Sequence, residues 1–255
     1  MGEKFNIAYV VDDNEEQLKM LQMSIDTLLK FNSVDNIYIM YYNTDESVLK
    51  EKLSKYKVNI EYFFFDINLI DNNFPELPNT CNGRLRYPSL ARWWISKIIP
   101  YEYFWYIDTD ILFKSDIKDL FLIYQREKLF FAFNRKNYNW GEITEYYHTN
   151  DLNAGILFIN SKLFNDLNIF DDIVKFYNDN ANSIKYVNQS GYSYLFEKYN
   201  DKCYIKISDT INIRPLNNDD KDIHYNNVKV FHCNGADKIS FYKNYEKIMG
   251  CRSNG

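Results

Sequence analysis

The chain has 255 residues, of which 46% are hydrophobic and 25% are charged, with only 8 Gly and 5 Pro. These values are typical of a globular protein and exclude a disordered or collagen-like chain. The length fits one large α/β domain or two small ones. The net charge is −5 and no basic run is present, which argues against a nucleic-acid partner.

The four cysteines are far apart and form no CxxC pair, so we expect reduced thiols rather than a disulfide framework. The sequence shows no secretory signal, and no stretch approaches the ~18 apolar residues of a membrane span. The expected compartment is therefore the cytosol, with peripheral contact at the inner membrane surface left open.

Apolar runs and helical periodicity alternate along the first part of the chain. Strands are predicted at 5–11, 37–42 and 58–66, separated by helices at 15–31 and 46–56. This βαβαβ order is typical of a parallel sheet with helices packed on its faces. The pattern therefore predicts an α/β fold for this part of the chain.

The rest of the chain contains further strands and helices after an interruption. Residues 67–87 hold Pro75, Pro78 and Gly83 and are predicted to form a long loop. Beyond this loop, a helix is predicted at 88–98, strands at 103–107, 130–133, 156–159 and 228–231, and helices at 161–167, 169–181 and 189–199. No internal repeat and no interdomain linker is found, which favours a single domain.

Polar residues follow several of the predicted strands. Asp12-Asp13-Asn14 follows the first strand, Asp66 the third, Asp108-Thr109-Asp110 the strand at 103–107, and His232 the last. In an open parallel sheet, ligands bind beyond the carboxyl ends of the strands. We therefore expect a binding site at this edge of the sheet.

Asp108 and Asp110 are two residues apart at the end of an aromatic strand. If the strand continues that far, both carboxylates point to the same side, where their repulsion favours a bound divalent cation. A solvated turn is the simpler explanation of an Asp-x-Asp tripeptide. However, an apolar Ile-Leu-Phe follows it, whereas a surface turn is more often followed by Gly, Asn or Pro.

The stretch WYIDTDILFKSDIKDLF resembles the core motif of the family 8 glycosyltransferases, which are retaining, metal-dependent GT-A enzymes that use sugar nucleotides. Four more stretches resemble family segments in the family's order: IAYVVDDN, LARWW at 90–94, LNAGILFIN at 152–160, and HCNGADK from His232 to Lys238. The resemblance runs from residue 6 to about 240. It implies a GT-A fold, with a Rossmann-like, mainly parallel central sheet flanked by helices.

The resemblance also implies how the domain is divided and which residues bind the donor. The nucleotide-binding half would be about 1–125, and the donor-sugar and acceptor half about 126–255. Asp108, Asp110 and His232 would bind Mn²⁺, or Mg²⁺. The remaining residues expected at the donor are Val10, Asp12, Asn14, Arg92, Thr109, Asn153, Ala154, Gly155, Gly235 and Lys238, and those expected in catalysis are Asn188, Gln189 and again Lys238.

Each of these residues has a purely structural alternative. Asp12-Asp13-Asn14 could cap the helix that begins at residue 15, since Asp and Asn are preferred there. Arg92 could form a surface salt bridge, the segment 153–155 could be a turn before a strand, and His232 could be a core histidine. The Gly235 and Lys238 offsets favour the binding role for His232, because Gly admits a phosphate close to the backbone and Lys supplies charge.

One position departs from the family pattern. The family usually has Asp-Gln where this chain has Asn188-Gln189. If the acid served as a nucleophile, this chain lacks it, which weakens a double-displacement mechanism. The departure fits a front-face mechanism, in which the leaving diphosphate helps to deprotonate the acceptor, and it leaves open altered donor choice or reduced activity.

The resemblance implies transfer of galactose or glucose from a UDP-sugar to a hydroxyl of a glycan or glycoconjugate. Two alternatives remain at this point. A GT-A domain that binds a UDP-sugar with little or no catalysis has Asn188 as its support. A receiver-like phosphoacceptor domain has VVDDNEEQL and Asp66 as its support, but leaves the residues after about 125 without a role.

Overall fold

The computed structural model describes residues 5–77, 80–81, 84–121, 127–135, 153–184, 187–213, 225–233 and 238–250. Its main sheet has seven strands, and every neighbouring pair is parallel except the two made by β9. In spatial order the strands are β10 (Cys203–Ser208), β8 (Phe130–Arg135), β9 (Ile156–Asn160), β6 (Tyr103–Ile107), β1 (Asn6–Val11), β2 (Asn36–Tyr41) and β3 (Asn59–Phe64). The prediction of a mainly parallel central sheet is confirmed.

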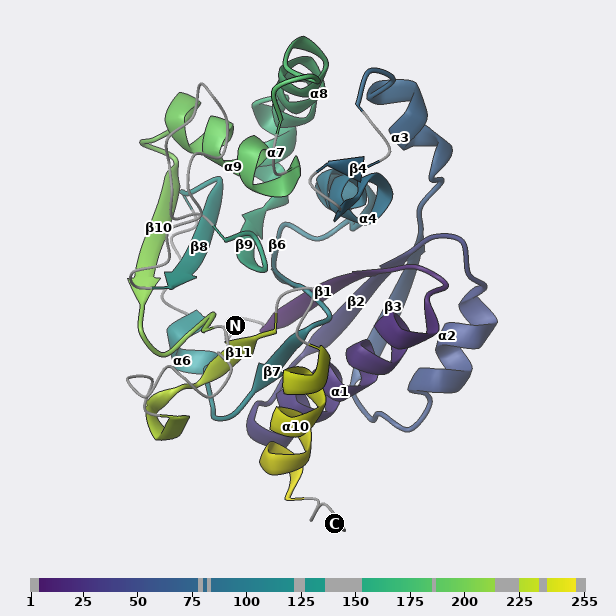
Figure 1. Ribbon diagram of the computed structural model, residues 1–255, viewed down its shortest axis with the longest axis vertical. Helices are drawn as coiled ribbons and strands as arrows, with labels where there is room; N and C mark the ends of the chain where they lie inside the picture. Colours follow the sequence, from purple (N-terminus) through teal and green to yellow (C-terminus); the bar gives the residue numbers. More distant parts are fainter. Residues whose placement is uncertain are drawn as a thin grey trace.

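Helices cover both faces of this sheet (Figure 1). One face carries α1 (Glu15–Phe31) and α2 (Glu46–Leu53). The opposite face carries α3 (Asn68–Asn73), α4 (Arg86–Ala91), the 3₁₀ helix η1 (Arg92–Trp94), α5 (Ile95–Ile98), α7 (Ser161–Asp166), α8 (Ile169–Asp179) and α9 (Val187–Lys198). The fold is therefore a three-layer α/β arrangement.

The pleat of β1 divides its side chains between two cores. Ile7, Tyr9 and Val11 pack with α1 and α2, whereas Ala8 and Val10 pack with the helices on the opposite face. All of these side chains are buried, as the near-continuous apolar run predicts for a central strand covered on both faces. The strand is thereby held rigidly, and residues 12–14 emerge at its carboxyl end.

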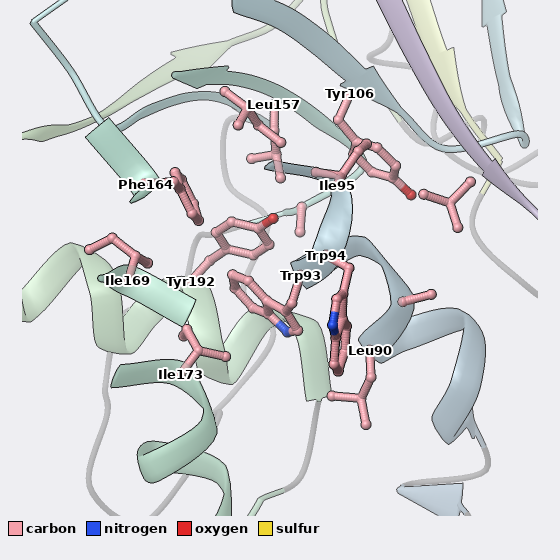
Figure 2. Packing of buried hydrophobic residues seen from close by; sticks show 14 of the residues in the cluster. Leu90, Trp93, Trp94, Ile95, Tyr106, Leu157, Phe164, Ile169, Ile173 and Tyr192 are labelled. Atoms are coloured by element: carbon pink, nitrogen blue, oxygen red, sulfur yellow. The ribbon is translucent and has the colours of Figure 1, made fainter. Parts of the chain in front are cut away.

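The core on the opposite face is rich in aromatic side chains. Trp93 packs against Tyr192 with ring centroids 4.3 Å apart, and Trp94 lies near Leu90 (Figure 2). Tyr106, from β6, borders the same cluster. Such contacts contribute about 0.5–1.5 kcal/mol each beyond the apolar area that they bury. They fix the short helices around residue 92 against the end of β6.

A second, two-stranded sheet lies beside the main one. β7 (Ile111–Phe113) pairs antiparallel with β11 (Val230–His232), and His232 lies opposite Ile111. The C-terminal helix α10 (Lys238–Met249) packs beside α1. The remaining short elements are β4 (Thr80–Cys81), β5 (Arg84–Leu85), α6 (Lys118–Phe121) and η2 (Tyr225–Asn227).

Most predicted elements are present with ends shifted by a few residues, but two predictions need correction. The segment 67–87 is not one long loop, because α3 and a β4–β5 pair lie within it. Ile70, Phe74 and Leu77 are buried at roughly helical spacing, a signal masked by the surrounding Asn and Pro residues. The last strand spans 230–232 instead of 228–231 and belongs to the small sheet; β10 and α10 were not predicted.

Within the described part of the chain, no helix combines the length and the apolar character needed to cross a bilayer.

Candidate active site

A pocket of about 280 Å³ opens at the carboxyl ends of β1 and β6. Its walls come from the ends of β1, β2 and β6, the first turns of α1, and the α4–η1 region. The lining residues are Val10, Asp12, Asn14, Glu16, Gln17, Met20, Tyr42, Pro88, Arg92, Tyr106, Asp108, Thr109 and Asp110. The pocket thus lies where an open α/β sheet is expected to bind its ligand.

Asp108 and Asp110 line this pocket, and the buried His232 lies beside them. Each offers one ligand atom, and these atoms lie within 4.8 Å of one another. His232 Nε2 is 3.2 Å from Asp110 Oδ1 and 3.6 Å from Asp108 Oδ2. Two carboxylates and one imidazole at such distances can share a divalent cation.

The geometry that produces this cluster differs from the one predicted. β6 ends at Ile107, so Asp108-Thr109-Asp110 forms a turn, and strand alternation does not place the two carboxylates on one side. The turn is held by the bond from Asp108 N to Gly155 O at 2.9 Å and from Cys233 N to Asp110 O at 2.9 Å. The second bond ties the turn directly to the segment that carries His232.

His232 reaches the site through the small sheet and not through the main one. β7 follows the acidic turn immediately, and its antiparallel partner β11 brings His232 back beside Ile111. The imidazole is buried, with 3% of the residue exposed, and its ring packs over the backbone of Gly155. Its Nδ1 is 2.8 Å from Asn212 Oδ1, and its Nε2 faces the two aspartates.

Arg92 is buried beside the acidic turn. Its Nη2 is 3.1 Å from Asp108 Oδ1, and its Nη1 donates to the carbonyl of Ala154 at 3.1 Å. Its guanidinium carbon lies 4.9 Å from the ring centre of Tyr106. Burial lowers the pKa of Arg92, but Asp108 together with Tyr106, Tyr192 and Asp110 outweighs this effect, so that the pKa lies above its usual range. Arg92 therefore stays charged, and because it is buried, the alternative of a surface salt bridge is wrong.

Asn188 completes the surroundings of Arg92. Its amide nitrogen donates to the carbonyl of Ser89, and its oxygen accepts from Arg92 Nε at 3.3 Å and Nη2 at 3.0 Å. Asn188 is buried on the first turn of α9, next to Gln189. The side chain at this position is therefore a neutral bridge between a main-chain carbonyl and a buried cation.

Two tyrosines donate to aspartates of the pocket. Tyr106 Oη donates to Asp108 Oδ1, and Tyr42 Oη lies 3.5 Å from Asp12 Oδ2. Burial raises the pKa of both phenols. The carboxylate of Asp12 adds to the rise at Tyr42, and that of Asp108 adds to it at Tyr106, where Arg92 acts in the opposite direction. Both hydroxyls therefore remain protonated donors at neutral pH. Neither tyrosine is predictable from the sequence, since a Tyr in an aromatic strand carries no signal of its own.

Asp12, Asp13 and Asn14, which follow β1, have different roles. Asn14 caps α1, because its side-chain oxygen accepts from Glu16 N and Gln17 N, both at 3.0 Å. Asp12 accepts from Asn14 N at 2.9 Å, and burial raises the pKa of its carboxyl. Asp12 and Asn14 both line the pocket, whereas Asp13 is exposed. The capping alternative thus holds for Asn14, and it does so without removing Asn14 from the pocket.

The structure also places the predicted donor-sugar segment near the site. Asn153 Oδ1 accepts from Gly155 N at 2.9 Å, and Ala154 bonds Arg92 through its carbonyl. Gln189 is buried, and its Oε1 has no hydrogen-bond partner in the part of the chain that the structure describes. Gly235 lies outside the described residues, and of Lys238 only the backbone, at the start of α10, is described.

Asp66 is not part of this pocket. It is exposed, and its carboxylate accepts from the backbone and side chain of Asn68 at the start of α3. The residues that sequence reasoning missed include Glu16, Gln17 and Met20 on α1. Gln17 Oε1 accepts from Asp12 N at 2.9 Å. Its place three residues after the N-cap is a recognisable capping signal that could have pointed to it.

No family model and no curated protein matches this sequence. Solved structures do match it. The galactosyltransferase LgtC, solved with donor and acceptor sugar analogues, has a TM-score of 0.69 and 14% identity over 98% of this chain and 97% of its own. The glycosyltransferase GlyE of Streptococcus pneumoniae has a TM-score of 0.58 and 16% identity over 80% of this chain and 45% of its own. This chain therefore spans less than half of GlyE.

A structure of another named activity also matches. The 4-diphosphocytidyl-2C-methyl-D-erythritol synthase of Anaerococcus prevotii has a TM-score of 0.51 and 18% identity over 96% of this chain and 99% of its own. Identities this low establish the fold. The chain has the GT-A fold that the sequence resemblance predicted. The receiver-domain alternative is wrong, because the residues after 125 supply β8, β9 and β10 of the same sheet.

Proposed function

We propose that this protein is a metal-dependent, retaining glycosyltransferase that moves galactose or glucose from a UDP-sugar to a hydroxyl of a glycan or glycoconjugate. The observation that carries the proposal is the convergence of Asp108, Asp110 and His232 at the pocket of a GT-A fold. These residues come from segments more than a hundred positions apart in the sequence. A chance surface cluster of acidic residues would not recruit a buried imidazole.

The side chains present fit a divalent cation. Carboxylates suit Mn²⁺ and Mg²⁺ equally well, and the imidazole of His232 favours Mn²⁺. When bound, the ion would act as a Lewis acid that offsets the charge developing on the leaving diphosphate. Tyr106 and Arg92 both contact Oδ1 of Asp108, and these contacts orient the carboxylate before a ligand binds. Such preorganisation lowers the reorganisation cost of catalysis.

The nucleoside would occupy the wall formed by the end of β1. Val10 offers an apolar surface for uracil, while Asp12 and Asn14 offer polar groups for ribose and base. Tyr42 donates toward Asp12 and holds its carboxylate at the pocket. Thr109, in the acidic turn, also lines the pocket and would contact the diphosphate.

The diphosphate requires cations or N–H donors besides a metal ion. Arg92 lines the pocket and is positively charged, and Asp108 neutralises part of that charge. Lys238 begins α10, six residues after His232, and would supply a further positive charge. Gly235 would let the intervening backbone approach the phosphate. Their roles rest on the sequence resemblance.

The donor sugar would lie over the segment 153–155 and beside α9. Among the described residues Gln189 Oε1 has no hydrogen-bond partner, and this supports a role in ligand contact, because a buried acceptor without a bond is costly unless a ligand completes it. As the anomeric C–O bond breaks, this oxygen would face the positive charge that develops on the sugar. Asn153 would bond a sugar hydroxyl.

A front-face substitution accounts for Asn188. An amide bonded to Ser89 O and Arg92 cannot act as a nucleophile, so no covalent sugar intermediate at this residue is expected. In the front-face step the acceptor oxygen forms the new bond to the anomeric carbon, the bond to the diphosphate oxygen breaks, and the acceptor proton moves to the leaving diphosphate. Retention of configuration follows because attack and departure share one face.

The experiment is a transfer assay with UDP-galactose and UDP-glucose, each with Mn²⁺, with Mg²⁺ or with EDTA, in which UDP release and the anomeric configuration of the product are measured. We expect turnover that EDTA abolishes and that Asp110→Asn removes, whereas Asp13→Asn, an exposed neighbour, leaves turnover unchanged. Metal-independent turnover would contradict the metal assignment. UDP-sugar binding without turnover would instead support the alternative of a catalytically weak binding domain.

A further inference from the structure

Asn212 lies beside the proposed metal cluster but was not among the predicted site residues. It is buried, with 4% of its surface exposed, and its backbone has a φ of 63°, in the left-handed region. The neighbouring residues hold this conformation in place. Ile213 N donates to Val230 O at 3.1 Å, and His232 N donates to Ile213 O at 2.9 Å. The segment therefore runs alongside β11, and Asn is one of the few residues that accepts such a backbone.

The Asn212 amide contacts three groups. Its Oδ1 is 2.8 Å from His232 Nδ1, while its Nδ2 donates to the carbonyl of Phe133 and, at 3.3 Å, to Asn153 Oδ1. Asn153 Oδ1 is itself identified as an acceptor, because Gly155 N donates to it at 2.9 Å. Two acceptors therefore face Nδ2, and the oxygen of Asn212 must be the atom that faces His232.

This orientation decides the tautomer of His232. An amide oxygen can only accept, so Nδ1 of the imidazole must carry the hydrogen. In a neutral imidazole, the lone pair is then on Nε2, and Nε2 is the atom that faces Asp108 and Asp110. Without Asn212, the two carboxylates would favour a hydrogen on Nε2. That tautomer donates to Asp110 and has no lone pair for a metal ion.

We infer that Asn212 is a positioning residue that holds His232 in its Nδ1–H tautomer, with the Nε2 lone pair directed at a divalent cation. The inference rests on the proposed function, since it concerns the same metal site. Hydrogen bonds of this kind to ligating histidines typically change metal affinity by about 10–100-fold when they are removed. A row of hydrogen bonds joins Gly155, Asn153, Asn212 and His232 in that order. It connects the segment before β9 to the histidine at the end of β11.

The test uses three variants of the full chain. Asn212→Gly keeps the left-handed backbone and deletes the amide. Asn212→Asp keeps an acceptor at His232 Nδ1 but places an oxygen opposite Phe133 O, so it costs stability while retaining the tautomer. Asn43→Gly is the matched control, because Asn43 also has a positive φ, of 54°, but its side chain is exposed and is not among those that line the pocket.

Two readouts are needed, and neither depends on turnover. Imidazole ¹⁵N spectra of the metal-free protein report which nitrogen of His232 carries hydrogen, and calorimetric titration with Mn²⁺ alone reports affinity. We expect Nδ1–H in the wild type, in Asn43→Gly and in Asn212→Asp. Asn212→Gly should lose this signature and bind Mn²⁺ about 10–100-fold more weakly, while Asn212→Asp stays within a few-fold of the wild type.

The outcomes separate this inference from the proposed function. If the wild type shows Nε2–H, or if Asn212→Gly binds Mn²⁺ as tightly as the wild type, Asn212 does not position His232. If the wild type has the Nδ1–H signature but does not bind Mn²⁺, the metal assignment fails and with it the purpose of the tautomer. If Asn212→Gly does not fold, the wild-type spectrum still reports which nitrogen of His232 carries hydrogen. The titration of Asn212→Asp then reports whether an acceptor at Nδ1 is enough to keep the Mn²⁺ affinity.

Discussion

The imidazole of His232 occupies the space that a side chain at residue 155 would need. A Cβ built on Gly155 would overlap the ring, because it would lie 2.1 Å from Cε1, 2.5 Å from Nδ1 and 2.8 Å from Nε2. The Asn-Ala-Gly segment and the histidine are thus two halves of one fitted contact, although 77 positions separate them in the sequence. Glycine is required here for close approach and not for backbone conformation.

We predict that Gly155→Ala displaces His232 and weakens Mn²⁺ binding at least about tenfold, as expected when a ligating imidazole is misplaced. The overlap should also cost about 1–3 kcal/mol of unfolding free energy. Gly191→Ala is the control, because its Cβ would meet Trp93 Cζ2 at 2.5 Å in the aromatic core instead. Urea unfolding should show similar losses for both variants, and calorimetry should show weakened Mn²⁺ binding only for Gly155→Ala. Equal affinities would contradict the fitted contact.

Arg92 is expected to be a stabilising cation as well as a pocket residue. Arg92→Met leaves Asp108 without its cationic partner and leaves Ala154 O unbonded, which should cost about 3–5 kcal/mol. Lys162→Met, which removes an exposed pair with Asp166, should leave the free energy of unfolding nearly unchanged. Urea unfolding measures both values. A loss for Arg92→Met no larger than that for Lys162→Met would show that the buried pair contributes little.

Asn188→Asp tests whether a carboxylate is compatible with this site. The substitution replaces the amide nitrogen that donates to Ser89 O with an oxygen, so two acceptors would face each other. It also adds a second negative charge near Asp108. We expect a loss of about 1–3 kcal/mol in unfolding free energy, without a gain in turnover. A more stable or more active Asn188→Asp variant would indicate that Asn188 is a loss-of-function change and would favour the binding-domain alternative.

The stability contribution of Asp12 should depend on pH. Burial raises the pKa of Asp12 above its usual 3.8, so the folded state binds this proton more tightly than the unfolded state does. Stability therefore falls as pH rises from the unfolded to the folded pKa, and the cost persists at neutral pH. Asp12→Asn removes the ionised carboxylate. Thermal unfolding should show a higher melting temperature for this variant at pH 7, and the difference should shrink as pH falls toward 4.

The same variant should bind UDP more weakly, because an amide replaces the acceptor proposed for ribose. Asp13→Asn is the control, since Asp13 is exposed and does not line the pocket. A pH-independent difference between Asp12→Asn and the wild type would contradict the burial-induced shift. Unchanged UDP affinity would place the nucleoside elsewhere in the pocket.

Sequence patterns were sufficient for the main sheet because its strands are apolar on both faces and its helices are amphipathic. β1, α1 and β2 were predicted almost to the residue. The prediction of a loop at 67–87 was wrong, because the Asn and Pro residues of this segment outweigh its three buried apolar positions when only neighbouring residues are considered. β10 was not predicted for a related reason. Lysine and an exposed Tyr204 interrupt its apolar pattern, although the strand pairs with β8 along six residues.

The candidate site shows the same division. Asp108, Asp110 and His232 were named from motifs, yet the assumed mechanism of strand alternation was wrong, because their convergence depends on a turn and on the β7–β11 pairing. Tyr42 and Asn212 could not be named, because each acts through a partner distant in the sequence. Tyr106 is only two positions from its partner Asp108, but nothing in the sequence distinguishes it from the other aromatic residues of its strand. A hydrogen bond across 20 or 30 positions leaves no mark on local spacing.

The amino-acid sequence by itself determined the α/β class, the order of the elements and the residue types available for a metal and a nucleotide. It does so because hydrophobic period and strand-end chemistry are local properties. Only the tertiary structure decided that Arg92 is paired with Asp108, that His232 packs on Gly155, and that Asn212 faces Nδ1 rather than Nε2. Those relationships are set by packing between segments, and packing is a property of the folded chain as a whole.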